Sequence, residues 1–305
     1  MKTNWLIVIV GPTAVGKSRV AVKLANLTDI ILSADSRQVF QEIPIGTAQV
    51  DRQEQNNIPH FFMGNFSLYE APSLNAGQFQ EQAEAILQAH YCNNKRAFLV
   101  GGSGLYVNAL CFGLNEFPDV APSFRERAIS LYQERGLQGL QTELQQLDPV
   151  YFERVDLQNA QRLMRALEVC WSTNRPFSSF WEPNVSPPSL FRPLFVGIVL
   201  PKEQLMQNIE RRTKNMLADG LIEEAKAVQA LRDCNALKTV GYPEVFDYLD
   251  GKISLDTARD LINLHTRQYA KRQMTWFKKN SNIQWFSPED IEGIREYIAR
   301  KTSSE

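Results

Sequence analysis

The stretch Ile7-Val8-Ile9-Val10-Gly11-Pro12-Thr13-Ala14-Val15-Gly16-Lys17-Ser18 joins a run of apolar residues directly to a loop framed by two glycines. The apolar run from Leu6 to Val10 is typical of a strand that is buried on both faces of a parallel sheet. The apolar spacing after Ser18 predicts a helix of about two to three turns. A strand, a glycine loop and a helix in this order predict an α/β fold, with a P-loop NTPase-like parallel sheet flanked by helices.

The loop itself fits the pattern G-x-x-x-x-G-K-[ST]. Its glycines let backbone N–H groups turn inward, so that a diphosphate can bind to these amides at the start of the helix. Lys17 adds a positive charge, and the Ser18 hydroxyl is the candidate ligand for Mg²⁺. The alternative is an ordinary glycine-rich turn between a strand and a helix. We predict a site for a phosphorylated ligand, which the loop does not identify further, at Gly11, Pro12, Thr13, Ala14, Val15, Gly16, Lys17 and Ser18.

Two further strand ends carry polar side chains. Asp35 follows the apolar run 29–33, at a position where parallel sheets bind ligands. It is either a catalytic carboxylate or a cap for the next turn. The apolar run 97–100 leads into Gly101-Gly102-Ser103-Gly104 and a further helix, which repeats the geometry of the first turn. We therefore expect Ser103 to offer its hydroxyl and backbone amides to the same anion.

The middle of the chain differs in character from its two ends. Prolines and polar residues punctuate the segments 115–122 and 181–188, and helical patterns lie between them. The strand pattern resumes at 194–200 and is followed mostly by helices. We predict a catalytic core of residues 1–114 and 189–305, interrupted by a helical insertion domain of residues 115–188. The segment 40–65 predicts a long loop with little regular structure.

The composition is that of an ordinary globular protein, with 305 residues and a formal net charge of −1. This charge argues against a protein that coats nucleic acid, although a local basic face is compatible with it. The predicted helix 255–279 has such a face, where Lys271 and Arg272 stand among aromatic residues; it either binds RNA or is a solvated surface. The sequence has no run of 18 apolar residues, and its four cysteines lack metal-ligand spacing. We expect a cytoplasmic protein with no membrane span.

A phosphate loop usually belongs to a nucleotide triphosphatase or a kinase, which needs a second acidic residue after a strand to hold Mg²⁺. Asp35 is the one carboxylate in such a position, because the strand 97–100 ends in glycines and a serine. If Asp35 instead acts as a base, the bound diphosphate need not donate a phosphate. It can be a leaving group.

Six blocks of sequence, in order, resemble the tRNA dimethylallyltransferase family. They are GPTAVGKS (11–18), ADSRQVF (34–40) with IGTA (45–48), GGSGLY (101–106), QRLMRALEV (161–169), VGY (240–242) and YAKRQMTWF (269–277). The resemblance covers essentially the whole chain, which makes it far more specific than the phosphate loop alone.

The resemblance implies transfer of the dimethylallyl group of dimethylallyl diphosphate to N6 of adenine 37, next to the tRNA anticodon. The products are N6-dimethylallyladenosine and diphosphate. In this reaction Asp35 accepts a hydrogen bond or proton from N6. The leaving diphosphate is stabilised by the loop amides, Lys17, a Mg²⁺ on Ser18, Ser103 and an arginine that matches Arg212. The target base has to leave its stack to reach such a pocket.

The resemblance also implies contacts with the anticodon stem-loop of tRNA, which involve the core and the insertion domain. To the residues that match the family we add Ser103, Arg125 and the basic residues of helix 255–279. The predicted tRNA-binding residues are Asp35, Ser36, Arg37, Gln38, Ser103, Arg125, Gln161, Arg162, Leu163, Met164, Arg165, Lys238, Thr239, Val240, Gly241, Tyr242, Pro243, Lys271 and Arg272.

Three alternative functions share parts of this sequence pattern. The nearest is a prenyltransferase that acts on free AMP, ADP or ATP, because its core chemistry is identical. The others are a small-molecule P-loop kinase and an RNA-binding protein with a vestigial phosphate site. The insertion domain and the basic helix favour a macromolecular acceptor, since a free nucleotide needs neither. We expect the protein to be a monomer.

Overall fold

The computed structural model describes residues 3–70, 73–115, 117–181 and 189–303. The chain forms two compact units, one made of Met1–Phe112 and Pro188–Glu305 and the other of Gly113–Pro187. The sequence predicts the boundaries between the core and the insertion domain after residue 114 and after residue 188. The predicted exit from the insertion, residues 182–188, lies outside the described residues.

The first unit contains a parallel sheet of six strands in the order β3-β2-β4-β1-β5-β6. Strand β1, in the middle of the sheet, is buried from Leu6 to Val10, as its unbroken apolar run predicts. The predicted α/β fold with a parallel sheet is confirmed. The strands are β1 (Trp5–Val10), β2 (Ile31–Ser33), β3 (His60–Phe61), β4 (Arg96–Gly101), β5 (Arg192–Ile198) and β6 (Gln284–Phe286).

The strand register brings the ends of β1, β2 and β4 to the same level. Val10 pairs with Gly101, and Ser33 pairs with Val100. The loops that follow these strands therefore emerge next to one another at the carboxyl edge of the sheet, where open α/β sheets bind ligands.

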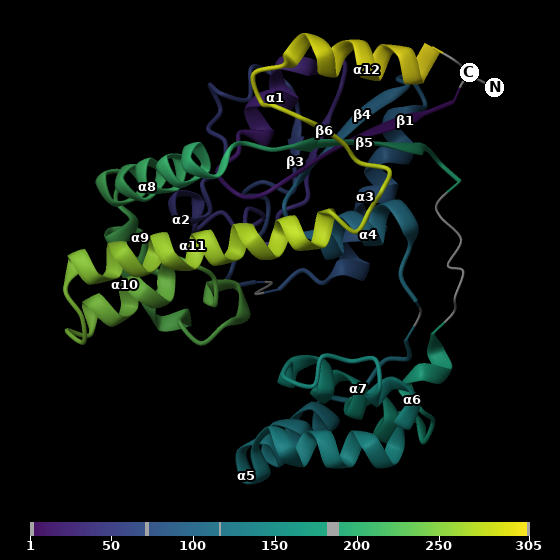
Figure 1. The fold of residues 1–305 in the computed structure, drawn as a ribbon, viewed down its shortest axis with the longest axis vertical. Helices are drawn as coiled ribbons and strands as arrows, with labels where there is room; N and C mark the ends of the chain where they lie inside the picture. The colour runs from purple at the N-terminus through teal and green to yellow at the C-terminus, as the bar shows by residue number, and fades with distance from the viewer. Residues whose placement is uncertain (1–2, 71–72, 116, 182–188, 304–305) are drawn as a thin grey trace. The chain divides into compact units, whose positions relative to one another are not determined.

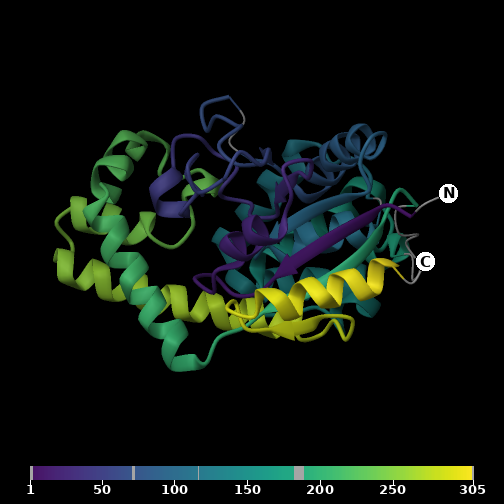
Figure 2. The same ribbon diagram turned by 90° about the horizontal axis from the view of Figure 1, so that it is seen from above.

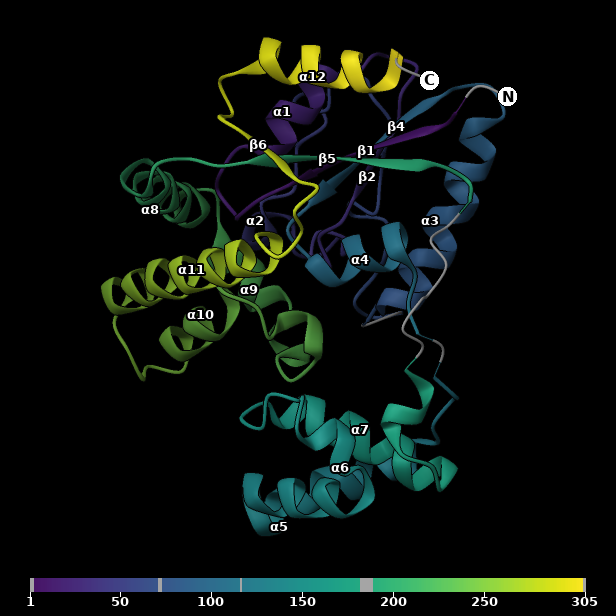
Figure 3. The same cartoon turned by 45° about the vertical axis from the view of Figure 1, so that its right-hand side comes forward.

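Helices cover both faces of this sheet. Helices α1 (Lys17–Leu24) and α12 (Ile291–Ser303) lie on one face, and α3 (Ala76–Tyr91) and α4 (Gly104–Phe112) lie on the other (Figures 1 and 3). On the first face Ile7 and Ile9 pack in one cluster with Leu24 and Ile294. Helix α3 begins at a capping box in which Asn75 and Gln78 satisfy each other's backbone amides.

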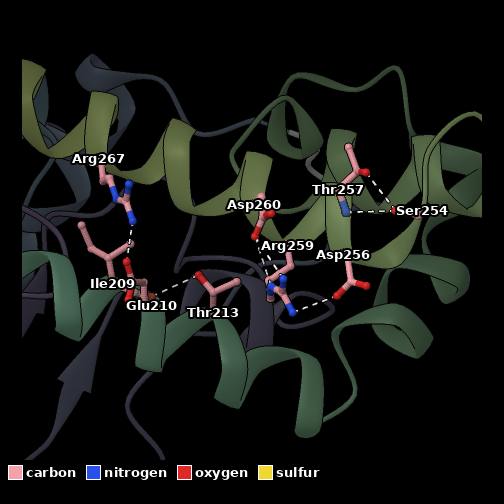
Figure 4. A network of polar contacts seen from close by, with 9 residues as sticks. All are labelled: Ile209, Glu210, Thr213, Ser254, Asp256, Thr257, Arg259, Asp260 and Arg267. Carbon is pink, nitrogen blue, oxygen red and sulfur yellow. Dashed lines mark hydrogen bonds and ion pairs between the residues drawn. The ribbon is translucent and has the colours of Figure 1, made fainter.

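Four more helices lie beyond the carboxyl ends of the strands (Figures 1 and 2). They are α8 (Lys202–Ala218), α9 (Leu221–Ala227), α10 (Tyr242–Leu249) and α11 (Leu255–Phe277). Helix α11 packs against α8, α10 and α4. An ion pair between Arg267 Nη2 of α11 and Glu210 Oε1 of α8, 2.5 Å apart, joins the two longest of them (Figure 4). This helical group forms the walls around the strand ends.

The second unit is helical, as the sequence predicts. Its long helix α5 (Pro122–Leu147) changes direction at Gly136, which has φ 61° and ψ −159°. Helices α6 (Pro149–Phe152) and α7 (Ala160–Thr173) follow. Leu140 and Leu144 of α5 pack on Leu163 and Leu167 of α7.

The prediction of a loop with little regular structure over 40–65 is partly wrong. This segment contains a short helix, α2 (Pro44–Thr47), and strand β3. Phe40, Ile43 and Phe62 are buried, and Phe40 also forms a parallel bridge with Phe66. The apolar residues of this segment do not recur with the period of a helix or a strand, so no periodic pattern indicates its anchoring in the core.

Among the described helices, none combines the length and the apolar character needed to cross a membrane. This agrees with the absence of a long apolar run in the sequence.

We predict that Gly101→Ala destabilises the first unit by about 1–3 kcal/mol, because a Cβ cannot be accommodated in this packed position. The added atom would lie 2.1 Å from the carbonyl oxygen of Ala34 and 2.3 Å from its carbon, which are backbone atoms. The matched control is Gly77→Ala in the first turn of α3, whose Cβ would meet Asn75 Oδ1 at an ordinary 3.4 Å. Urea unfolding of both variants checks this, and equal midpoints would contradict it.

Candidate active site

The glycine loop leaves the start of helix α1 open to an anion. Gly16 is the residue before the helix and has φ 94°, a backbone conformation that favours glycine. No side chain caps the helix at this end. Its first N–H groups, which have no partner within the helix, are therefore available to a phosphate group.

Two cations lie at this loop. Lys17 Nζ donates a hydrogen bond to the carbonyl oxygen of Pro12 at 2.7 Å, and Arg212 Nη1 of α8 donates to Thr13 Oγ1 at 3.0 Å. Burial lowers the pKa of Lys17 to about 8, and the neighbouring Asp35 carboxylate partly offsets this effect. Burial also lowers the pKa of Arg212, against the opposing effect of the same carboxylate. Two partly desolvated positive charges therefore converge on the loop.

Asp35 follows β2 and faces both cations. Its Oδ1 accepts a hydrogen bond from the backbone N–H of Arg37 at 3.0 Å, so the carboxylate does cap its own turn. It also lines a cavity of about 120 Å³ together with Lys17, Ser18 and Arg212. The two alternatives drawn from the sequence, cap and catalytic carboxylate, are thus compatible in one residue.

Asp35 also lines a second cavity, of about 320 Å³. Arg212 lines this cavity as well, and so do Thr47 of α2 and Tyr269 of α11. Burial raises the pKa of Tyr269 to about 12, so this phenol is neutral at physiological pH. Predicted tRNA-binding residues that the structure brings together on these walls are Asp35, Ser36, Arg37, Lys238, Thr239, Val240, Gly241 and Arg272. Gln38 lines the smaller cavity.

Ser103 supports the Asp35 turn. Its hydroxyl accepts a hydrogen bond from the backbone N–H of Ser36 at 3.1 Å, and its own N–H donates to the Ala34 carbonyl oxygen at 3.0 Å. Ser103 does not line either cavity. A direct contact between this hydroxyl and a diphosphate stays a prediction.

Gln273 of α11 is a site residue that the sequence did not reveal. This side chain is 5% exposed, and its two ends bridge two turns of the site. Its Oε1 accepts from the backbone N–H of Thr13 at 2.8 Å, and its Nε2 donates to the Gly102 carbonyl oxygen at 3.0 Å. The sequence feature that could have identified Gln273 is its spacing, because Tyr269 and Gln273 are four residues apart and share one helix face.

Three of the predicted tRNA-binding residues have buried side chains. The side chains of Tyr242, Leu163 and Met164 are buried, with exposed fractions of 0%, 0% and 4%. Tyr242 packs beneath α2, and the other two form part of the core of the second unit. These apolar and aromatic side chains of the binding motifs are interior packing in this structure, and a contact of the three residues with RNA stays a prediction.

The second unit holds a separate group of the predicted residues. Arg125 Nη1 lies 2.6 Å from Glu168 Oε1, and Arg125 Nη2 donates to Gln161 Oε1 at 2.5 Å. Arg165 Nη1 lies 3.4 Å from the other oxygen of Glu168. A buried carboxylate thus orders two arginines, whose contact with tRNA stays a prediction.

The 120 Å³ cavity also contains oxygen donors suited to Mg²⁺. Ser18 and Thr13 contribute hydroxyls, and Asp35 contributes a carboxylate. In the described parts of the chain, no three histidine, cysteine or acidic residues gather in a way that would bind a metal on their own. The donor set therefore fits a Mg²⁺ that is bound jointly with a phosphorylated ligand, as is usual for this ion.

Comparison with known proteins gives one consistent result. Residues 38–280 match the model of the family described as IPP transferase. The tRNA dimethylallyltransferase of Christiangramia forsetii is 41% identical over 99% of this chain and 100% of its own, and that of Cytophaga hutchinsonii is 39% identical over 98% and 97%. The crystal structure of a tRNA isopentenylpyrophosphate transferase from Bacillus halodurans, 32% identical, covers 99% of this chain and 97% of its own with a TM-score of 0.72.

The glycine loop, the facing carboxylate and the full-length similarity lead to one assignment: this chain belongs to the IPP transferase family of tRNA dimethylallyltransferases.

Proposed function

We propose that the protein transfers the dimethylallyl group of dimethylallyl diphosphate to N6 of adenine 37 in tRNA and releases diphosphate. One observation carries this proposal. The phosphate loop, two cations and the Asp35 carboxylate line a single small cavity, so a diphosphate on the loop and a nucleophile at Asp35 would be neighbours. Holding both reactants in this way removes much of the entropic part of the barrier.

The leaving group is stabilised at the loop. As the bond between C1 of the dimethylallyl group and the diphosphate oxygen breaks, its electron pair stays on the diphosphate. Negative charge then builds up beside the amides of α1, Lys17 and Arg212, which are already desolvated before the reaction. Fixed charges in such a water-poor site are worth more than they are in solution.

The acceptor is activated at Asp35. The lone pair of the adenine N6 forms the new bond to C1, and the amine proton passes to the carboxylate, whose second oxygen is not engaged in capping the turn. The turn is held in place by the Ser103 hydroxyl, which accepts from the Ser36 N–H, and by the Arg37 N–H, which donates to Asp35. This fixes the direction from which the carboxylate meets N6.

Ser18 and the diphosphate oxygens would hold Mg²⁺ in the smaller cavity. The ion supplies additional positive charge to the departing phosphate oxygens. Thr13 is less available, because its hydroxyl already accepts from Arg212.

The larger cavity suits a flipped base with its flanking phosphates. Its wall includes the aromatic ring of Tyr269, and Arg37, Lys238 and Arg272 supply positive charge. An unstacked base commonly packs on an aromatic ring while basic side chains bind the backbone.

The experiment that tests this function offers labelled dimethylallyl diphosphate with either unmodified tRNA or AMP, ADP and ATP. We expect label in tRNA at adenine 37 and none in free nucleotides. Label in free nucleotides alone would establish the adenylate prenyltransferase instead, and no transfer to any acceptor would contradict both.

Asp35→Asn should lower the single-turnover transfer rate by about 10²–10⁴-fold, because the amide cannot accept the proton. The affinity for tRNA should change by less than about threefold, since the loss falls on the chemical step. Asp233→Asn, which alters an exposed carboxylate outside the cavities, is the control. An Asp35→Asn enzyme with normal turnover and weakened tRNA binding would refute the assigned role.

The affinity for inorganic pyrophosphate should fall as the pH rises above 8. Lys17 has a pKa of about 8 in the free protein, and a bound anion favours its charged form. Well below pH 8 the lysine is already charged and contributes little pH dependence. Above it, binding must take up a proton, which weakens affinity by up to about tenfold per pH unit.

Calorimetry measures the pyrophosphate affinity of the wild type and of Lys17→Ala across pH 7–10. Pyrophosphate itself changes protonation in this range, but this change affects both proteins equally. The difference between the two pH profiles therefore reports on Lys17. Parallel pH profiles for the two proteins would contradict the prediction that Lys17 causes the fall in affinity.

Replacing Lys271 and Arg272 together by alanine should weaken tRNA binding and flatten its salt dependence by about 0.7–0.9 in log–log slope for each phosphate that is no longer neutralised. Both side chains are exposed on α11. The matched control is Lys95→Ala with Lys301→Ala, which removes two exposed charges elsewhere. If the slope of the α11 variant equals that of the control, this helix face is only a solvated surface.

A further inference from the structure

Glu224 of α9 makes a set of contacts that the reaction described above does not use. Its Oε2 accepts from the backbone N–H of Ile45 at 2.7 Å, and its Oε1 accepts from the N–H of Gly46 at 2.8 Å. The hydroxyl of Tyr242 donates to Oε1 at 2.7 Å. Ile43, which precedes α2, provides no side-chain cap. The carboxylate of a distant helix therefore caps this short helix.

The capped segment, residues 43–48, forms a wall shared by three cavities. Gly46 and Thr47 line the 320 Å³ cavity, and Ala48 lines the 120 Å³ cavity. Pro44, Ile45 and Ala48 also line a third, wider cavity of about 1040 Å³, together with Ala14 and Gly16 of the glycine loop. Glu224 lines none of the three, so it cannot touch a ligand in them.

The same segment holds Arg212 and Gln38 by its carbonyl groups. Arg212 Nη2 donates to the Thr47 oxygen at 3.4 Å. Gln38 Nε2 donates to the oxygens of Thr47 and Ala48 at 3.1 Å and 3.0 Å. Among the residues that the structure describes, Arg212 alone lines all three cavities, and it also contacts the glycine loop through Thr13. A shift of segment 43–48 would therefore release the arginine from one of its two anchors.

Packing leaves this segment little freedom. A Cβ on Gly46 would lie 2.4 Å from the hydroxyl oxygen of Tyr242, and that tyrosine is completely buried. Burial and the Glu224 carboxylate both raise the pKa of Tyr242, so its hydroxyl remains a donor to Glu224 at any physiological pH. Contacts with Glu224 and Tyr242 thus hold segment 43–48 in place.

We propose that Glu224 is a positioning residue for the diphosphate site. It fixes the segment 43–48, and the Thr47 carbonyl in turn orients the Arg212 guanidinium toward the leaving group. The proposal rests on the proposed function in one respect, which is that Arg212 binds the diphosphate.

The test compares Glu224→Gln with Glu223→Gln, its exposed neighbour on the same helix. The amide keeps the size of the side chain but turns an NH₂ group toward donors, so at least one of the three hydrogen bonds cannot form. We expect the affinity for inorganic pyrophosphate, measured by calorimetry, to fall about tenfold in Glu224→Gln and to stay unchanged in the control. In the transfer assay kcat should fall, and KM for tRNA should stay within about threefold.

A double-mutant cycle separates positioning from mere stability. If Glu224 acts through Arg212, Glu224→Gln should have little further effect on pyrophosphate affinity in an Arg212→Lys background. Full additivity would overturn the proposal. So would a Glu224→Gln protein with a lower melting temperature and wild-type pyrophosphate affinity.

Glu224→Asp provides the same test if the glutamine variant does not fold. Its side chain is one methylene shorter and cannot reach both backbone amides, so reduced pyrophosphate affinity is expected and unchanged affinity contradicts the proposal. The binding readout also separates this proposal from the function. A wild type that binds pyrophosphate but transfers nothing to tRNA would refute the function and leave the role of Glu224 to be decided by the binding data.

Discussion

The aligned ends of β1, β2 and β4 are the constraint on which the site depends. Because Val10 lies beside Gly101 and Ser33 beside Val100, three loops that are distant in sequence emerge side by side. Hydrogen bonds then join these loops in pairs. Ser103 connects the second loop with the third, and Gln273 connects the first with the third. The result is a rigid frame in which the glycine loop faces a carboxylate.

Within this frame, positive charge is placed before any ligand arrives. Lys17 and Arg212 are both desolvated, and the Asp35 carboxylate offsets the cost of this desolvation only in part. Partly buried charges of one sign are costly to the folded protein. An anion on the loop relieves this cost, and it does so most when its charge is greatest. That condition is met by a departing diphosphate, which links the electrostatics of the fold to the reaction.

Sequence patterns predict the local parts of this arrangement and miss its long-range supports. The strand and glycine loop, Asp35 at a strand end and the helical insertion follow from periodicity and spacing within short windows. Gln273 and Thr13 are 260 positions apart, and Glu224 and Ile45 are 179 apart. Their pairing depends on how α8 to α11 pack beyond the strand ends, and no local pattern encodes this. Tyr242 is a further example of what local patterns miss. Its motif predicts a contact with tRNA, but the fold buries its side chain.

The most direct measurement is a crystal structure with an unreactive dimethylallyl diphosphate analogue and an anticodon stem-loop. The account predicts the diphosphate on the amides of residues 13–18, within hydrogen-bond distance of Lys17 and Arg212. It also predicts adenine N6 about 3 Å from the Asp35 carboxylate, or one water away. A diphosphate bound away from the glycine loop, or a target adenine whose N6 does not face Asp35, would contradict it.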